Sequence, residues 1–149
     1  MSNAQKSIDE VQKEIIEEFS FLGDDKESII YYIMELGQKL PQMDESQKNE
    51  HNIVKGCQSK VWLSTKMEDE QLYFIADSNT EITKGLISLL IRVLSGQRVS
   101  DIIDAQLYFI EKIGMHGIIG SQRSNGFAAM IKQMKLYAIA YKSKMNSEA

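Results

Sequence analysis

The residue best suited to covalent chemistry is Cys57, the only cysteine in the sequence. It lies in the segment Gly56-Cys57-Gln58-Ser59, between two apolar runs with β-branched residues, so we expect the thiol at a turn between strands. Gly56 permits backbone angles that other residues resist, and it would leave open space beside the sulfur. The residues alone leave two interpretations: a reactive thiol on an accessible loop, or a small buried hydrophobe, which is the commoner role of a lone cysteine.

A reactive cysteine must be a thiolate, and positive charge or a general base nearby would help to form one. Lys55 and Lys60 flank the turn, and at a turn such lysines are commonly solvated. A cysteine hydrolase would need His51 or His116 within hydrogen-bond reach of the thiol, and we expect surface or loop positions for both histidines. A single cysteine forms neither an internal disulfide nor a tetrahedral thiolate cage, so Cys57 acts alone or with a partner protein.

Helices are expected on both sides of the segment that holds the cysteine. Apolar residues at helical spacing, together with capping and terminating residues, predict helices at about residues 8–23, 24–37, 80–96 and 124–144, with short helical turns across 99–113. Asp24 or Asp25 is expected to cap the second helix, and Thr80 with Thr83 precedes the third.

Strands are expected in the middle of the chain, where the apolar pattern changes. β-branched and aromatic runs at residues 53–54, 61–63 and 72–75 predict a short antiparallel meander of three strands. Trp62 is expected to pack into the core, because a strand tryptophan beside apolar neighbours usually points inward. The segregation of strands and helices predicts an α+β fold, a small three-stranded antiparallel sheet flanked by N- and C-terminal helices.

Composition excludes several classes of function. The chain has 149 residues, 43% hydrophobic and 26% charged, which fits one soluble domain over residues 1–149. Its net charge of -4 gives no general attraction for nucleic acid or anionic lipid. The most apolar stretch, residues 85–91, is far shorter than the roughly 20 residues of a membrane span, and the polar N-terminus does not resemble a signal peptide. We therefore expect a cytoplasmic protein that binds neither nucleic acid nor membrane.

The segment EHNIVKGCQSKVWL has a Gly-Cys-Gln-Ser turn before a Val-Trp strand. In this it resembles the cysteine loop of the SufE family of sulfur acceptors. Three more segments agree in order and spacing: YYIMELGQKLP, FIADSNTEITKGLISLLI and SQRSNGFAAMI. Together they cover most of the chain from about residue 25 to 135. Residues 114–124 depart from the family because they lack a proline before the Arg-Ser pair.

The resemblance implies roles for particular residues. Cys57 would be the nucleophile that accepts sulfur, with Gly56, Gln58 and Ser59 shaping the turn around it. Arg123 corresponds to the family's arginine near a helix start, where it would either order that start or take part in docking. The fold would be the one that the family shares with IscU-type scaffolds.

The resemblance also implies partners. Cys57 would receive persulfide sulfur from a pyridoxal-phosphate (PLP) dependent cysteine desulfurase of the SufS type, and the chain would stimulate that enzyme. The sulfur would then pass to an iron-sulfur cluster scaffold of the SufBCD type. PLP belongs to the desulfurase, so neither a cofactor of its own nor a metal is expected for this chain. Whether a carrier that turns over only with its partner counts as an enzyme is a matter of definition.

Besides the cysteine hydrolase described above, two other interpretations remain open. In the first, the chain is a docking or regulatory module of the desulfurase, and Cys57 is structural. In the second, it is an IscU-like cluster scaffold, but that role calls for several thiolates and this chain has one.

Overall fold

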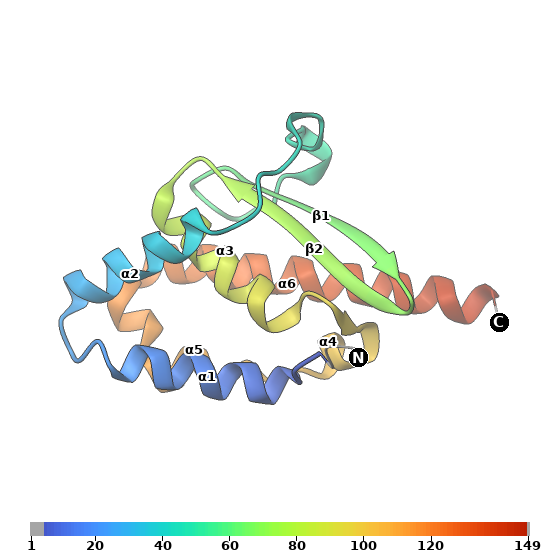
Figure 1. Cartoon of the computed structure of the whole chain (residues 1–149). Coiled ribbons are helices and arrows are strands. Elements are labelled where there is room, and N and C mark those ends of the chain that lie inside the picture. The colour runs from blue at the N-terminus through green and yellow to red at the C-terminus, as the bar shows by residue number, and fades with distance from the viewer. Residues whose placement is uncertain (1–4, 149) are drawn as a thin grey trace.

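The centre of the fold is a long antiparallel hairpin made of β1 (Val61–Glu68) and β2 (Gln71–Ser78). The computed structural model describes residues 5–148 and pairs Val61 with Ser78 at the open end of this hairpin. Asp69 and Glu70 form the connecting turn, and both have positive φ angles, as a two-residue hairpin turn of type I′ requires. One face of the hairpin packs on helices α3 (Glu81–Leu94) and α6 (Met115–Glu148) (Figure 1).

The third strand differs from the one that the sequence predicts. The sheet order is β1-β2-β3, and β3 is the two-residue segment Gln97–Arg98, which pairs with the start of β2. The predicted strand at residues 53–54 forms a single bridge, between Ile53 and Trp62, because the chain turns away into the cysteine loop. The α+β class with a three-stranded antiparallel sheet and flanking helices is confirmed, while the identity of one strand was wrong.

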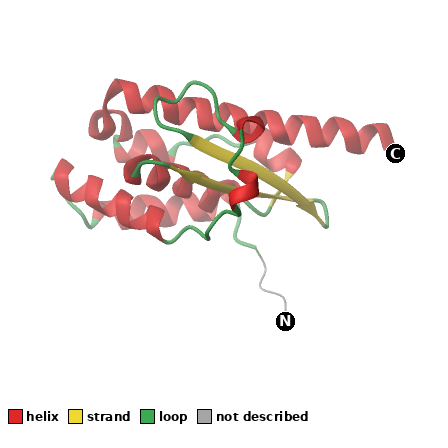
Figure 2. Ribbon diagram, turned by 90° about the horizontal axis from the view of Figure 1, so that it is seen from above, coloured by secondary structure: helices red, strands yellow, loops and turns green. Residues whose placement is uncertain are grey.

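Helices α1 (Ile8–Ser20) and α2 (Lys26–Gln38) precede the sheet, as predicted, and Figure 2 shows the helices gathered around the hairpin. Asp25 is the N-cap residue of α2, but its carboxylate accepts a hydrogen bond from Ser28 Oγ (2.6 Å) and not from a backbone amide. Short elements complete the chain: η1 (Glu45–Gln47), η2 (Glu50–Asn52), α4 (Val99–Asp104) and α5 (Phe109–Ile113).

Helices α2 and α3 cross so closely that glycine is required at the contact. A Cβ atom at Gly85 would lie 2.0 Å from the carbonyl oxygen of Ile33, and one at Gly37 would lie 2.6 Å from the amide nitrogen of Gly85. Both distances are far below any real van der Waals contact. This crossing fixes the first turns of α3, on which part of the candidate site is built.

The last helix is longer than predicted and is broken near its start. It begins at Met115, and Gly120 interrupts it with φ 85° and ψ 169°, a conformation essentially restricted to glycine. The part that follows Gly120 contains the predicted apolar face, of which Phe127, Met130 and Met134 are buried. Within residues 5–148, no helix is both long enough and apolar enough to cross a membrane.

Candidate functional site

The cysteine loop is fixed at both ends by hydrogen bonds. Before the cysteine, the amide of the buried Val54 donates to the carbonyl of Val61 (2.8 Å). After it, the amide of Lys60 donates to Asn79 Oδ1 (3.0 Å), and the Lys60 carbonyl accepts from the Asn79 amide (3.2 Å). Residues 55–58 form the tip between these anchors. The thiol is therefore held at a turn beside the open end of the hairpin, as the sequence predicts.

Cys57 is half-buried against the second part of α6. Its thiol donates a hydrogen bond to the carbonyl oxygen of Gly126 (3.4 Å), which is its one hydrogen bond among the described residues. Burial raises the pKa of the Cys57 thiol, because desolvation disfavours the thiolate. A carbonyl oxygen accepts a hydrogen bond from a thiol but offers no donor to a thiolate, so the resting arrangement favours the neutral form.

Two glycines, Gly56 and Gly126, lie where the cysteine loop meets α6. Neither has the role that the sequence predicts for Gly56, which was to leave open space beside the sulfur. Gly56 has φ 99°, and the space at its missing side chain is taken by Ala129, whose Cβ would lie 3.0 Å from a Cβ at position 56. Gly126 lies beside the sulfur, and an added Cβ there would be 3.5 Å from Cys57 Sγ, an ordinary van der Waals distance. Gly56 thus lets the loop settle on α6, and Gly126 accepts the hydrogen bond of the thiol.

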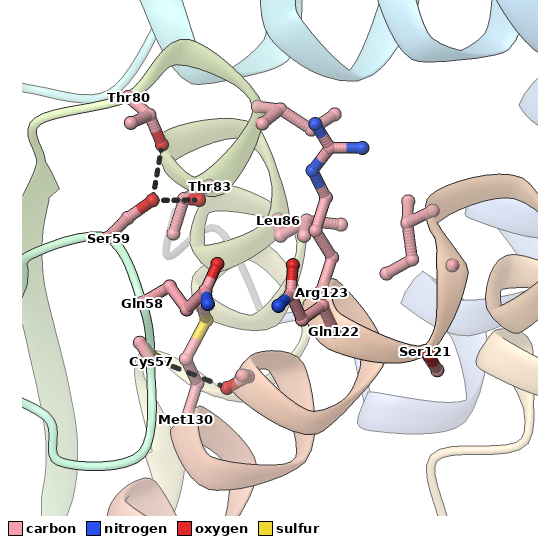
Figure 3. Close-up of a pocket in the computed structure, with 14 residues that line it drawn as sticks. Cys57, Gln58, Ser59, Thr80, Thr83, Leu86, Ser121, Gln122, Arg123 and Met130 are labelled. Carbon is pink, nitrogen blue, oxygen red and sulfur yellow. Dashed lines mark hydrogen bonds between the residues drawn. The ribbon is translucent and has the colours of Figure 1, made fainter.

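A pocket of about 650 Å³ opens beside Cys57 (Figure 3). It lies between the cysteine loop, the first turns of α3 and the start of α6 around the Gly120 break. Apolar atoms come from Ile82, Leu86, Ile119 and Met130. None of the fourteen described residues that line it is acidic. The pocket could admit a small group attached to the sulfur.

The loop residues that the sequence singled out surround this pocket, with one exception. Four of the singled-out residues line it: Cys57, Gln58, Ser59 and Arg123, which is far from the others in sequence. Gly56 does not line it. Arg123 is exposed, and Figure 3 shows its guanidinium pointing away from Cys57. The arginine therefore lies at the pocket rim, and its two roles, in ordering the helix start or in docking, stay predictions.

Ser59 is held by two threonines that the sequence suggested only as helix-start residues. The hydroxyls of Thr80 and Thr83 donate to Ser59 Oγ at 3.1 and 3.3 Å (Figure 3). Thr80 is the N-cap residue of α3, but its side chain makes no capping hydrogen bond to the helix backbone because it is turned toward Ser59. This hydroxyl cluster had no signal in the sequence, since threonine before a helix normally indicates a cap.

A charged cluster closes the other side of the loop. Asp77 is paired with Lys48 (2.8 Å) and Lys84 (3.3 Å), and its carboxylate also accepts from the amide of Ser78 (2.8 Å). Burial by itself would raise the pKa of Asp77, but these hydrogen bonds outweigh it and lower the pKa below its ordinary value. Asp77 thereby connects the segment before the cysteine loop with the end of β2 and the first turn of α3.

Trp62 contributes to this cluster and not to the core, contrary to the prediction. It is partly exposed, and Lys48 Nζ lies 5.9 Å from the centroid of its ring. Trp62 pairs with Asp77 across the hairpin, on the face opposite to the core residues Leu63 and Phe74. The apolar neighbours that suggested an inward direction alternate with it along the strand, so they point the other way.

The other candidate groups lie outside the pocket. Lys55 and Lys60 are exposed and do not line it. His51 is exposed in η2, and His116 lines a separate pocket beside α5. Neither histidine hydrogen-bonds to Cys57, so the described residues provide no cysteine-histidine pair for hydrolysis. Within residues 5–148, no three His, Cys, Asp or Glu side chains are grouped so that they could hold a metal ion.

Comparison with known proteins identifies relatives over most of the chain. A family model described as SufE, the Fe-S metabolism associated domain, matches residues 13–138. An uncharacterized SufE-like protein of Rhizobium meliloti is 41% identical over 128 residues, which cover 82% of this chain and 90% of the relative. A SufE-like protein of Synechocystis is 35% identical over 130 residues, covering 85% of this chain and 79% of the relative.

More distant similarity extends to plants and to a solved structure. SufE-like protein 1 of Arabidopsis thaliana, a chloroplastic and mitochondrial protein, is 31% identical over 131 residues, covering 85% of this chain and 34% of the plant protein. The solution structure of a hypothetical protein from Thermus thermophilus has a TM-score of 0.72 and 17% identity, and the match covers 89% of this chain and 96% of that one. At this identity, the structural match supports the fold alone.

Proposed function

Because this chain belongs to the SufE family, we propose that Cys57 accepts sulfur from the persulfide of a PLP-dependent cysteine desulfurase of the SufS type. The sulfur then passes to an iron-sulfur cluster scaffold of the SufBCD type. Family membership supports a role in iron-sulfur metabolism, and the finer steps are our proposal. Location in the cytoplasm and stimulation of the desulfurase stay predictions from the sequence.

The observation that carries the proposal is the position of the one cysteine. Cys57 lies at the tip of a loop that is anchored on both sides, and its sulfur adjoins a pocket with room for an added atom. Among the described residues, the tip makes one hydrogen bond to α6, from the thiol, beside the packing of Gly56 on Ala129. A structural cysteine would be expected deeper in the core, among the fully buried side chains of the sheet and helices.

The chemistry needs a nucleophile, a leaving group and access, but no metal. The Cys57 thiolate attacks the outer sulfur of the desulfurase persulfide, and a new S–S bond forms at Cys57. The S–S bond on the desulfurase breaks, and its cysteine leaves as a thiolate with the bonding electrons. Cys57 is then a persulfide, and the outer sulfur keeps its proton. Since this chain has no second cysteine, the persulfide cannot collapse to an internal disulfide and release sulfide.

The resting thiol must be activated before this step. In the free protein it is desolvated and donates to the Gly126 carbonyl, both of which favour the neutral form. Drawing residues 55–58 away from α6 breaks one weak hydrogen bond and leaves the anchors at Val54 and Lys60 intact. A docked partner would thus both expose the thiol and make it a better acid, so that the sulfur reacts only in the complex.

Intact-protein mass spectrometry tests the proposal directly. The chain is incubated with a SufS-type cysteine desulfurase and free cysteine, and its mass is read without reductant. We expect the wild type to gain one or more sulfur atoms and Cys57→Ser to gain none. Absence of any gain beside an active desulfurase would contradict the carrier function.

The same variant separates the carrier from a docking module. Under the carrier function, Cys57→Ser still binds the desulfurase but carries no sulfur and supports no onward transfer. A docking module with a structural cysteine would stimulate the desulfurase equally well in both forms. Binding measured by titration serves as the control, because it shows whether the serine variant has kept its docking surface.

A further inference from the structure

The lining of the Cys57 pocket carries hydrogen-bond donors that do not contact the resting thiol. We call Gln58, Ser59 and Gln122 the polar wall; all three line the pocket. Figure 3 shows Gln58 and Gln122 extending toward one another across the cavity from the cysteine loop and from α6. The thiol itself is engaged elsewhere, with the Gly126 carbonyl.

The hydroxyl of Ser59 is arranged so that its proton is free for a ligand. A serine oxygen has two acceptor positions and one proton. Thr80 and Thr83 both donate to Ser59 Oγ, which fills its two acceptor positions. Its own proton has no acceptor in this cluster, and the oxygen belongs to a residue that lines the pocket. The two threonines therefore convert Ser59 into a donor.

A persulfide on Cys57 would have to direct its outer sulfur toward this wall. The outer sulfur lies about 2 Å from Sγ. It cannot remain beside the Gly126 carbonyl as an anion, because two electron-rich groups would then face each other. The pocket is the adjoining open space, and no acidic side chain among its described lining residues opposes a negative charge.

We propose that the polar wall binds the outer sulfur of a Cys57 persulfide as an anion. Three neutral donors stabilise the charge without a metal or a cation at the sulfur. Arg123, the one other ionisable side chain of the lining, points away from Cys57 in Figure 3. Of the other charged side chains on the cysteine loop and the first turn of α3, Lys84 is paired with Asp77, and Lys55, Lys60 and Glu81 are exposed and do not line the pocket.

This inference deepens the proposed function and rests on it, because it concerns the species that sulfur transfer would create. An anionic outer sulfur is a poor target for a thiolate, since like charges repel. The wall would therefore keep the sulfur from small thiols until a partner draws the loop tip out of the pocket. Ser59, Gln58 and Gln122 would be binding residues for the transferred atom, and Thr80 and Thr83 would be positioning residues that act through Ser59.

The test uses a persulfide made without any desulfurase. Cys57 is first converted to its mixed disulfide with thionitrobenzoate, and hydrosulfide then attacks Cys57 Sγ. The bond to thionitrobenzoate breaks, thionitrobenzoate leaves as a thiolate, and the hydrosulfide proton stays on the new persulfide. The rate of persulfide alkylation by iodoacetamide is then measured by mass spectrometry across a range of pH.

Ser59→Ala is expected to move the midpoint of this alkylation profile to higher pH. Loss of one hydrogen bond to a charged acceptor should raise the pKa of the persulfide by about one, which leaves roughly tenfold less anion on the acidic side of the profile. Gln122→Leu should move the profile in the same direction. Ser59→Thr keeps the hydroxyl, so its persulfide profile should match that of the wild type. Ser88→Ala removes a hydroxyl from α3 that bonds to the Gly85 carbonyl outside this pocket, and it should leave the profile unchanged.

The unmodified thiol separates a binding role from a structural one. Because the thiol faces Gly126, its alkylation profile should be the same in the wild type and in Ser59→Ala. An unchanged persulfide profile in both Ser59→Ala and Gln122→Leu would overturn the inference. So would parallel shifts of the thiol and persulfide profiles, which would mean that the loop had merely loosened. Either result could occur while the chain still takes up sulfur normally from a desulfurase. Failure of this inference can therefore be distinguished from failure of the proposed function.

Discussion

The thiol of Cys57 donates a 3.4 Å hydrogen bond to the carbonyl oxygen of Gly126, which is 69 positions later in the chain. This contact joins the tip of the cysteine loop to α6. It also favours the protonated thiol, which is not the nucleophilic form. The free protein therefore has a sulfur that is accessible to a pocket but chemically at rest.

The first prediction concerns the acidity of Cys57. Burial raises its pKa, so the alkylation rate of the native protein should continue to rise above the pH at which an ordinary thiol, with a pKa of about 8.5, has levelled off. In denaturant, the profile should return to that ordinary value. Iodoacetamide alkylation followed by intact mass, with Cys57→Ser as the background control, checks this. A native midpoint at or below the denatured one would contradict it.

The same shift has a defined sign for stability. A thiol whose pKa is raised on folding stabilises the folded state most at pH values below the unfolded pKa. That contribution is lost as the pH rises through the folded pKa, because the buried thiolate is disfavoured. The free energy of unfolding of the wild type relative to Cys57→Ser should therefore be highest near neutral pH and fall in alkaline solution, where only the wild type has a thiol to ionise.

The second prediction concerns Asp77, which links three segments around the cysteine loop. Asp77→Asn removes the charge that holds Lys48 and Lys84, and Lys48 would lose its buried partner. We expect a loss of about 1–2 kcal/mol in the free energy of unfolding, between the values typical of exposed and buried pairs. Urea denaturation at neutral pH measures it. The lowered pKa of Asp77 implies that the wild type loses this advantage as the pH falls through that folded pKa.

Glu45→Gln is the matched control for this prediction. Glu45 is also paired with Lys48, at 2.9 Å, but its side chain is 81% exposed whereas that of Asp77 is 12% exposed. An exposed pair contributes little because water and salt screen it, so Glu45→Gln should change stability by less than about 0.5 kcal/mol. Equal effects of the two substitutions would mean that burial of Asp77 does not matter.

Local pattern was enough to predict the hairpin and the cysteine turn, but not the edge of the sheet. Residues 61–63 and 72–75 carry the alternation and β-branched content of strands, and they lie within β1 and β2. Gln97 and Arg98 carry no such pattern. They pair because the Gly96 amide donates to the Leu72 carbonyl (2.8 Å), a long-range contact that brings them to the start of β2. Their strand is determined by tertiary structure.

The site could be predicted only in part for a similar reason. The turn chemistry of residues 56–59 and the resemblance of the flanking segments led to Cys57, Gln58, Ser59 and Arg123, which share a pocket. The hydroxyls of Thr80 and Thr83 were missed because their partner, Ser59, is more than twenty positions away and a cap is the commoner use of threonine there. Gly126 has no local signal either, since its importance comes from the sulfur packed against it.

The last prediction tests the helix crossing that supports the site. Gly85→Ala would place a Cβ atom 2.0 Å from the backbone carbonyl oxygen of Ile33, and a backbone atom cannot move aside as a flexible side chain can. Helices α2 and α3 would have to separate, with a loss of about 3 kcal/mol or more in the free energy of unfolding. Gly117→Ala is the control, because that glycine is helical, lacks a positive φ and has open space around its added Cβ. The control should be neutral or stabilising by up to about 1 kcal/mol, since alanine favours a helix. Thermal denaturation of both variants measures the difference. If Gly85→Ala proved as stable as Gly117→Ala, the close crossing of α2 and α3 would be wrong, and with it the position of the first turns of α3 beside Cys57.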